Sequence, residues 1–152
     1  MKIWVDADSF PRRQRDIVKK AASRTRIAAI FISDRKLEDI KGRWVENVLV
    51  PHGSGEADEE LVRRVEAGDL AITRDVPLAA RLVERGAVVL DDRGGVFTPE
   101  NIRERLSIRD LMESFRQAGL PADTTDAPGE KEIREFAGAL DRALTKMMRS
   151  RT

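Results

Sequence analysis

The stretch Lys2-Ile3-Trp4-Val5-Asp6-Ala7-Asp8 begins with an apolar run and ends on two carboxylates. The apolar part predicts a buried strand over residues 2–5. In an open parallel sheet, the carboxyl ends of the strands form the crevice where ligands bind. Two carboxylates about 4 Å apart repel by roughly 1 to 4 kcal/mol unless a proton or a cation lies between them. We therefore expect a divalent cation at Asp6 and Asp8.

Composition limits the chemistry that such a site can use. The chain has 152 residues, a net charge of +1 and no cysteine, which excludes thiolate nucleophiles and zinc–thiolate sites. His52 is the only histidine, so a metal site must use oxygen ligands, which favours Mg²⁺ or Mn²⁺. The net charge alone predicts no binding to a polyanion. Without a signal peptide or an apolar stretch long enough to span a bilayer, we expect a cytoplasmic protein that does not engage membranes.

Short apolar runs alternate with helical patterns along the first two thirds of the chain. The predicted strands cover residues 2–5, 27–32, 45–50, 70–73 and 87–90, and the predicted helices cover residues 11–24, 57–65 and 77–85. The polar segment 34–42 has no clear assignment. Alternation of this kind predicts an α/β fold with a mostly parallel central sheet and helices on both faces.

The pattern of the remaining residues predicts two further helices. Gly94-Gly95 predicts a turn, and Thr98 and Pro99 suit the N-cap and first position of a helix that ends near residue 117. We expect a domain over residues 1–119, a linker over 120–129 and a C-terminal helix over 130–152. That helix packs either on the domain or on another subunit, so a homodimer is one of the possible arrangements.

Acidic residues gather where this fold would bring strand ends together. Asp6 and Asp8 follow the first predicted strand, Asp75 follows the strand 70–73, and Glu56 and Asp58 open the helix after the strand 45–50. Each acid has a structural alternative: Asp8 and Asp75 suit helix N-caps, and Glu56 and Asp58 suit the positive end of a helix dipole. A cap needs only one acid, whereas Asp6 lies within the strand end.

Several motifs together resemble the bacterial YaiI/YqxD family, which is placed in the PIN-like nuclease superfamily. The resemblance rests on Asp6-Ala7-Asp8 with Pro11, on Ala57-Asp58, and on the segments 72–79, 101–106 and 136–142. It implies a PIN-like three-layer sandwich. It also implies that Asp6, Asp58 and Asp75 are catalytic metal ligands, with Asp8 beside them. Glu56 and Asp91 are second-tier acidic candidates. Two positions depart from the family pattern: Ser9-Phe10 replaces a usual Ala-Cys, and Gly55 stands where many members carry Asp.

Basic residues offer candidate contacts for a phosphate backbone. Arg12 and Arg13 lie near a helix N-terminus, where cations are disfavoured, and Arg103 begins a second group with Arg105 and Arg109. Both groups could equally be solvated helix faces. Thr73 would orient a carboxylate or contact a phosphate. Aromatic residues are only 5% of the chain and tyrosine is absent, so recognition of nucleic acid, with RNA favoured, should use the backbone.

Three functions follow as hypotheses. The first is a Mg²⁺- or Mn²⁺-dependent phosphodiesterase, a ribonuclease or structure-directed nuclease. The second is a non-catalytic nucleic-acid-binding or regulatory protein. The third is a haloacid-dehalogenase-like phosphatase, in which residues 6–9 would be the nucleophile loop, Ile72-Thr73 the second motif and Asp91-Asp92 the terminal acids. That chemistry also requires a lysine, and residues 74–90 contain none.

Overall fold

The computed structural model describes residues 1–8, 10–53, 55–120 and 128–150. The described residues form one six-stranded sheet in the order β3-β2-β1-β4-β5-β6. Adjacent strands are parallel except for the antiparallel pair β5 and β6. The strands are β1 (Ile3–Asp6), β2 (Ala29–Ser33), β3 (Val45–Leu49), β4 (Leu70–Ile72), β5 (Val88–Leu90) and β6 (Val96–Phe97).

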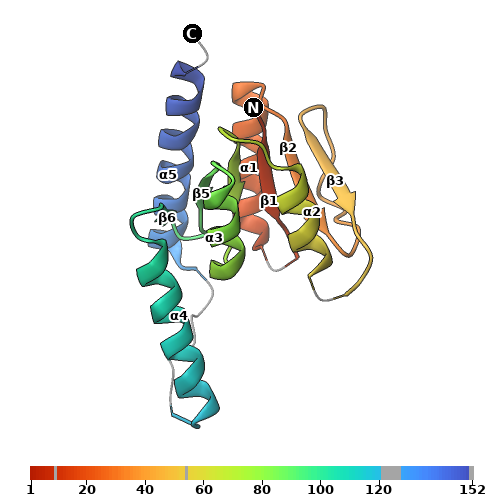
Figure 1. Ribbon diagram of the computed structural model, residues 1–152. Helices are drawn as coiled ribbons and strands as arrows, with labels where there is room; N and C mark the ends of the chain where they lie inside the picture. The colour runs from red at the N-terminus through yellow and green to blue at the C-terminus, as the bar shows by residue number, and fades with distance from the viewer. Residues whose placement is uncertain (9, 54, 121–127, 151–152) are drawn as a thin grey trace.

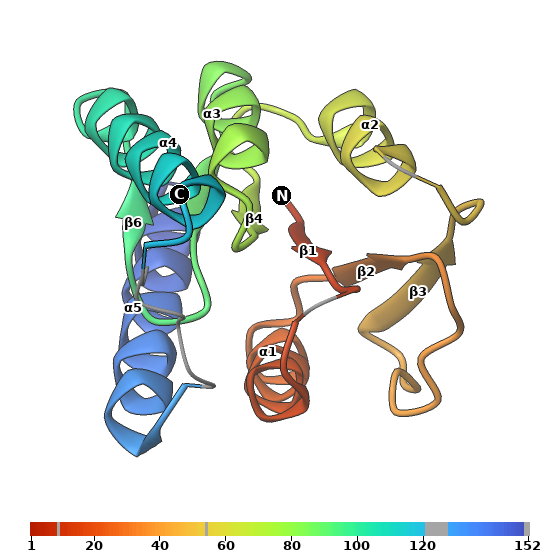
Figure 2. The same cartoon turned by 90° about the horizontal axis from the view of Figure 1, so that it is seen from below.

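Helices lie on both faces of this sheet, as Figure 2 shows. One face carries α1 (Arg12–Thr25) and α5 (Glu130–Arg149). The other carries α2 (Glu56–Arg64) and α3 (Val76–Glu84), with α4 (Ile102–Gln117) packed against α3. The prediction of an α/β fold with a mostly parallel sheet is confirmed. No helix in the described ranges is long and apolar enough to cross a membrane.

β1 occupies the middle of the sheet because both of its faces are apolar. Ile3 and Val5 belong to the core on the side of α1 and α5, and Trp4 belongs to the core on the side of α2 and α3. All three side chains are at most 2% exposed. A strand that is buried on both faces reads as a continuous apolar run, which explains why residues 3–5 lack a polar position.

The order of the strands reverses next to β1. The chain runs from β1 to β2 and β3 on one side, and then returns through α2 to β4 on the other side. The carboxyl ends of β1 and β4 therefore lie next to each other at a topological switch point, the usual place for ligands in open α/β sheets. In Figure 1 these ends point downward, and α4 extends beyond them.

One predicted boundary needs correction, and two segments without a prediction are now assigned. The strand β6 was not expected, because its two residues are too few to show a periodic pattern. α4 begins at Ile102 rather than near Thr98, since Thr98 and Asn101 form a turn of their own. In that turn the Thr98 N–H donates to Asn101 Oδ1 (2.8 Å) and the Asn101 N–H donates to Thr98 Oγ1 (3.1 Å). The unassigned segment 34–42 joins β2 to β3 without a helix or a strand.

The C-terminal helix α5 shares its core with β1. Phe136, Leu140 and Leu144 are at most 1% exposed, and the Phe136 ring meets the Phe10 ring edge-on with 5.8 Å between centroids. Ion pairs join α1 to α5 at both ends, from Arg13 to Glu130 and from Arg24 to Asp141. Residues 121–127 of the predicted linker lie outside the described residues, and the division at residue 119 stays a prediction.

Asp69 holds the opposite, amino end of the sheet together. Its Oδ1 accepts the backbone N–H of Lys2 (3.0 Å), and its Oδ2 accepts the indole N–H of Trp4 and the N–H of Glu66 (2.9 Å each). The carboxylate is buried, so these bonds replace its hydration. We assign Asp69 a structural role, since it lies at the end of β4 away from the other acids.

Candidate functional site

Thr73 connects the two central strand ends. It follows β4, is fully buried, and donates its hydroxyl to Asp6 Oδ2 at 2.9 Å. Thr73 Oγ1 in turn accepts the backbone N–H of Asp75 at 3.0 Å. One side chain therefore orients the carboxylate at the end of β1 and the loop that carries Asp75. The expectation that Thr73 orients a carboxylate is confirmed.

Asp75 is the N-cap of α3. Its Oδ1 accepts the N–H of Leu78 at 3.1 Å, which satisfies a free donor of the first helical turn. The N-cap interpretation of Asp75 is confirmed, but it uses only one oxygen. No described residue donates a hydrogen bond to Oδ2, so that oxygen can still serve a ligand.

Asp6, Asp58 and Asp75 act on one another electrostatically. The pKa of Asp6 is raised to about 6, chiefly by burial and to a smaller extent by the charges of Asp58, Asp75 and Asp8, although the Thr73 hydrogen bond lowers it. Asp58 lies in the first turn of α2, where burial first and the charge of Asp75 second raise its pKa. Carboxylates from three separate strand–helix units thus lie at the same edge of the sheet, and the charges of Asp58 and Asp75 act on Asp6. That they bind one metal ion together stays a prediction.

Asp8 lies beside this group but is held by another loop. Its Oδ1 accepts the backbone N–H of Asp34, at the end of β2, at 2.8 Å. The interpretation of Asp8 as an N-cap is wrong, because α1 is capped by Pro11 without a side-chain hydrogen bond. The other candidate cap, Ser9, lies outside the described residues. Burial raises the pKa of Asp8.

Asp34 and His52 lie at the same edge of the sheet as these acids. The sequence did not identify either of them as a site residue. His52 Nδ1 lies 2.5 Å from Asp34 Oδ2, and this bond lowers the pKa of Asp34. Both residues follow neighbouring strands, β2 and β3. A polar residue shortly after a buried strand is the sequence signal that could have identified these two residues. Asp34 was missed because segment 34–42 had no predicted secondary structure.

The acid pair after β5 divides into two roles. Asp91 holds the β5–β6 turn: its Oδ1 accepts the N–H groups of Arg93 and Gly95 (2.8 Å each), and its Oδ2 accepts from Arg105 (3.2 Å). Asp92 is only 3% exposed, and its Oδ2 lies 3.3 Å from Nε of Arg74. Burial raises the pKa of Asp92. Asp92 rather than Asp91 is therefore the buried acid beside the Thr73–Asp75 loop.

The remaining predicted residues are exposed. Glu56 opens α2 at the surface, and Arg12 and Arg103 are exposed on α1 and α4. Arg13 is engaged by Glu130 of α5 through both guanidinium nitrogens. The proposed basic track on α1 is thus interrupted by an ion pair to α5.

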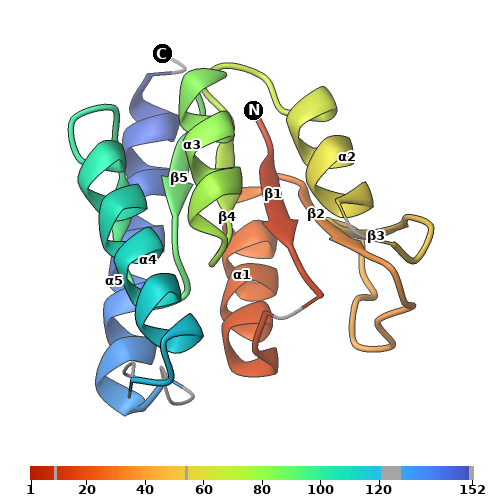
Figure 3. The ribbon, with the colours of Figure 1, turned by 60° about the horizontal axis from the view of Figure 1, so that its bottom comes forward.

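A hollow of about 330 Å³ adjoins Asp75 and is lined by arginine. Arg74, Asp75, Val76 and Pro77 form it together with Arg109 of α4. Arg109 therefore lies beside the acids, whereas Arg103 does not line this hollow. Helix α4, which extends past the end of the sheet, brings a cation to the site from a position 34 residues later in the chain than Asp75. Figure 3 shows α4 running alongside α3.

A family model described as "Uncharacterized BCR, YaiI/YqxD family" matches residues 4–146. This chain belongs to the YaiI/YqxD family. It is 43% identical over 150 residues to a "UPF0178 protein" of Myxococcus xanthus, covering 99% of this chain and 98% of that protein. It is 39% identical over 151 residues to the "UPF0178 protein YaiI" of Escherichia coli, covering 99% of both. No solved structure gave a significant match.

The YaiI/YqxD match covers every acid of the site, but the names of these relatives state no activity. The chemistry must therefore be argued from the side chains. Within the described ranges, no three histidine or acidic side chains are close enough together to hold a metal ion. Mg²⁺ commonly takes only one or two carboxylates and completes its shell with water and substrate phosphate. The all-oxygen donors of this YaiI/YqxD protein fit a cation held in that way.

Proposed function

We propose that this protein is a Mg²⁺- or Mn²⁺-dependent phosphodiesterase of PIN-like architecture that cleaves nucleic acid, with RNA favoured. The proposal is supported by one observation: Asp6, Asp58 and Asp75 come from three strand–helix units at the carboxyl-end edge of the sheet, and the charges of Asp58 and Asp75 raise the pKa of Asp6. Asp6 is largely buried among like charges, and a cation would offset the cost of ionising it. The proposed site of action is the cytoplasm.

The residues divide into two groups under this proposal. Asp6 and Asp75 would hold the cation, with Asp58 and Asp8 as further oxygen donors. When bound, the cation would lower the pKa of a coordinated water and neutralise charge on the scissile phosphate. Thr73 keeps Asp6 in place through its hydroxyl. Arg74 and Arg109 line the hollow next to Asp75 and would bind phosphate oxygens, for which guanidinium geometry is well suited.

We expect Asp75→Asn to lose metal-dependent cleavage by about 100-fold while the protein stays folded. Asparagine can still accept the Leu78 N–H as an N-cap, so the change removes charge and leaves the start of α3 intact. The measurement is cleavage of end-labelled single-stranded and hairpin RNA and DNA in Mn²⁺ or Mg²⁺, with circular dichroism as the check on folding.

The matched control is Asp141→Asn, which removes an exposed acid on α5 that pairs with Arg24. It should cleave as the wild type does. Equal cleavage by Asp75→Asn and the control would refute the role of Asp75. Wild-type protein that binds RNA in EDTA but yields no product with either metal would support the non-catalytic nucleic-acid-binding function instead.

Arg109→Gln should weaken substrate binding more than Arg103→Gln, although the two arginines lie on the same helix. Only Arg109 lines the hollow beside Asp75, so its loss should raise KM several-fold and leave kcat nearly unchanged. The comparison requires KM and kcat for both variants on one labelled RNA. Equal effects of the two substitutions would mean that the hollow does not bind the phosphate backbone.

A further inference from the structure

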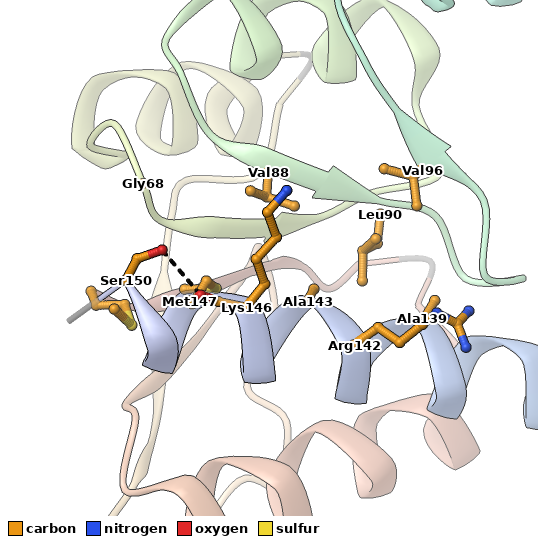
Figure 4. Close-up of a pocket in the computed structure, with 11 residues that line it drawn as sticks. Gly68, Val88, Leu90, Val96, Ala139, Arg142, Ala143, Lys146, Met147 and Ser150 are labelled. Atoms are coloured by element: carbon orange, nitrogen blue, oxygen red, sulfur yellow. Dashed lines mark hydrogen bonds between the residues drawn. The ribbon is translucent and has the colours of Figure 1, made fainter. Parts of the chain in front are cut away.

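A second cavity lies at the opposite, amino end of the sheet, away from the carboxylates. It has a volume of about 400 Å³ and is lined by Met1, by Gly68, by strands β5 and β6 and by one side of α5. A volume in this range is typical of sites for small molecules. Figure 4 shows the strands on one side of the cavity and α5 on the other.

Small side chains on α5 leave this space open. Ala139 and Ala143 are one helical turn apart and face Val88 and Leu90 of β5 across the cavity. Beyond β5 the sheet ends in β6, which is two residues long, and Val96 of that strand is 43% exposed. α5 and the edge of the sheet thus enclose a space with apolar walls that the side chains of neither element fill.

Two cations stand at the opening of this apolar cavity. Arg142 and Lys146 of α5 line it, and neither forms an ion pair within the described part of the chain. No acidic side chain is among the lining residues. In Figure 4, Lys146 extends from α5 toward β5, whereas Arg142 extends along the helix. Apolar walls with unpaired cations at the rim complement a ligand that has an apolar body and an anionic group.

We propose that this cavity binds a free, small amphipathic anion, such as a medium-chain carboxylate. Its chain would lie against Ala139, Ala143, Leu90 and Met147, and its carboxylate would pair with Lys146, while Arg142 adds positive charge beside the cavity. The apolar body supplies most of the binding free energy by leaving water, and the two cations select an anion over a cation. This site is separate from the proposed catalytic site, so binding should survive Asp6→Asn.

Decanoate is the probe, and titration calorimetry on the wild type should show one site per chain. The protein has four methionines, so methyl-labelled methionine gives a resolved map by NMR. The methyl signals of Met1 and Met147 should shift on binding, because both residues line the cavity. The signal of Met112 on α4 should stay, because it does not line the cavity.

Two variants test the two parts of the proposal. Arg142→Gln with Lys146→Gln should weaken decanoate binding about tenfold, since an exposed ion pair and a nearby exposed charge each contribute modestly. Ala143→Phe should fill the cavity and abolish binding. The matched control is Lys131→Gln with Arg134→Gln, which removes the same charge from α5 at residues that do not line the cavity, and it should bind as the wild type does.

Three kinds of outcome, which are absent binding, absent charge selectivity and a role in dimerisation, would overturn the proposal. One is no saturable decanoate binding by the wild type. Another is equal binding of decanoate and decyltrimethylammonium, or equal affinity of the double cation variant and its control. The third is a wild-type dimer that Ala143→Phe converts to monomer without any decanoate binding, which would make the cavity an interface between copies of this chain.

Discussion

Asp6→Asn should reduce metal-dependent cleavage by at least about 1,000-fold and should make the folded protein more stable at pH 7. Asp6 ends the central strand, and three other carboxylates act on its charge. Asparagine keeps one side-chain oxygen but carries no negative charge, so the variant loses the anionic ligand proposed to hold the cation. If the only role of Asp6 were to stabilise the fold, its ionised form should not destabilise it.

The direction of the stability change follows from the pKa of Asp6. The pKa rises from 3.8 to about 6 on folding, so the folded protein favours the protonated acid. Asp6 therefore contributes stability that is fully present below about pH 4 and is lost as the pH rises through 6. At pH 7 the ionised carboxylate costs on the order of 1 to 3 kcal/mol, which asparagine avoids while still accepting the Thr73 hydroxyl.

Urea unfolding of both proteins at pH 4, 5, 6 and 7 measures this difference. The stability gain of Asp6→Asn should be near zero at pH 4 and largest at pH 7, and Mn²⁺ should stabilise only the wild type. Asp141→Asn, an exposed acid, serves as the control and should show a difference of less than about 0.5 kcal/mol throughout. A variant that is less stable than the wild type at pH 7 would contradict the assignment.

Phe136→Ala should destabilise the protein by about 4 kcal/mol, although Phe136 lies far along the chain from the sheet. Its side chain is fully buried, packs edge-on against Phe10 and belongs to the same core as Ile3 and Val5 of β1. Truncation to alanine would leave a cavity between α5 and α1, beside the central strand. A loss of this size is a large fraction of the stability of an ordinary domain.

The matched control is Phe115→Ala on α4, a helix with no buried residue in its described structure. The same substitution there should cost about 1 kcal/mol, because less apolar surface leaves water on folding. Chemical unfolding of the two variants decides the result. Similar losses for both would mean that α5 contributes no more to the core than α4 does.

Local patterns in the sequence were sufficient for most of the elements. Buried strands appear as apolar runs and helices as amphipathic periods, so β1 to β5 and the five helices of the described residues lie close to their predicted positions. Strand–helix alternation then implies a parallel sheet, whose carboxyl ends share one edge. That is why Asp6, Asp58 and Asp75 could be expected to meet. The two-residue strand β6 and the Thr98–Asn101 turn were missed because neither carries a periodic signal.

Contacts between distant segments required the tertiary structure. Asp91 and Asp92 are adjacent in the chain, and only the packing shows that Asp91 holds a turn while Asp92 is buried near Arg74. Likewise Arg103 and Arg109 share a helix, and the packing of α4 against α3 places only Arg109 in the hollow beside Asp75.

The sequence by itself determined the α/β class, the acidic residues at the strand ends and the absence of cysteine, because these depend on local periodicity and on which residue types are present. The tertiary structure decided which acids are free for a ligand, where α5 docks and that a cavity opens beneath it. Those properties depend on side chains brought together from segments many residues apart, and on space that the packing leaves unfilled. No local pattern encodes either of them.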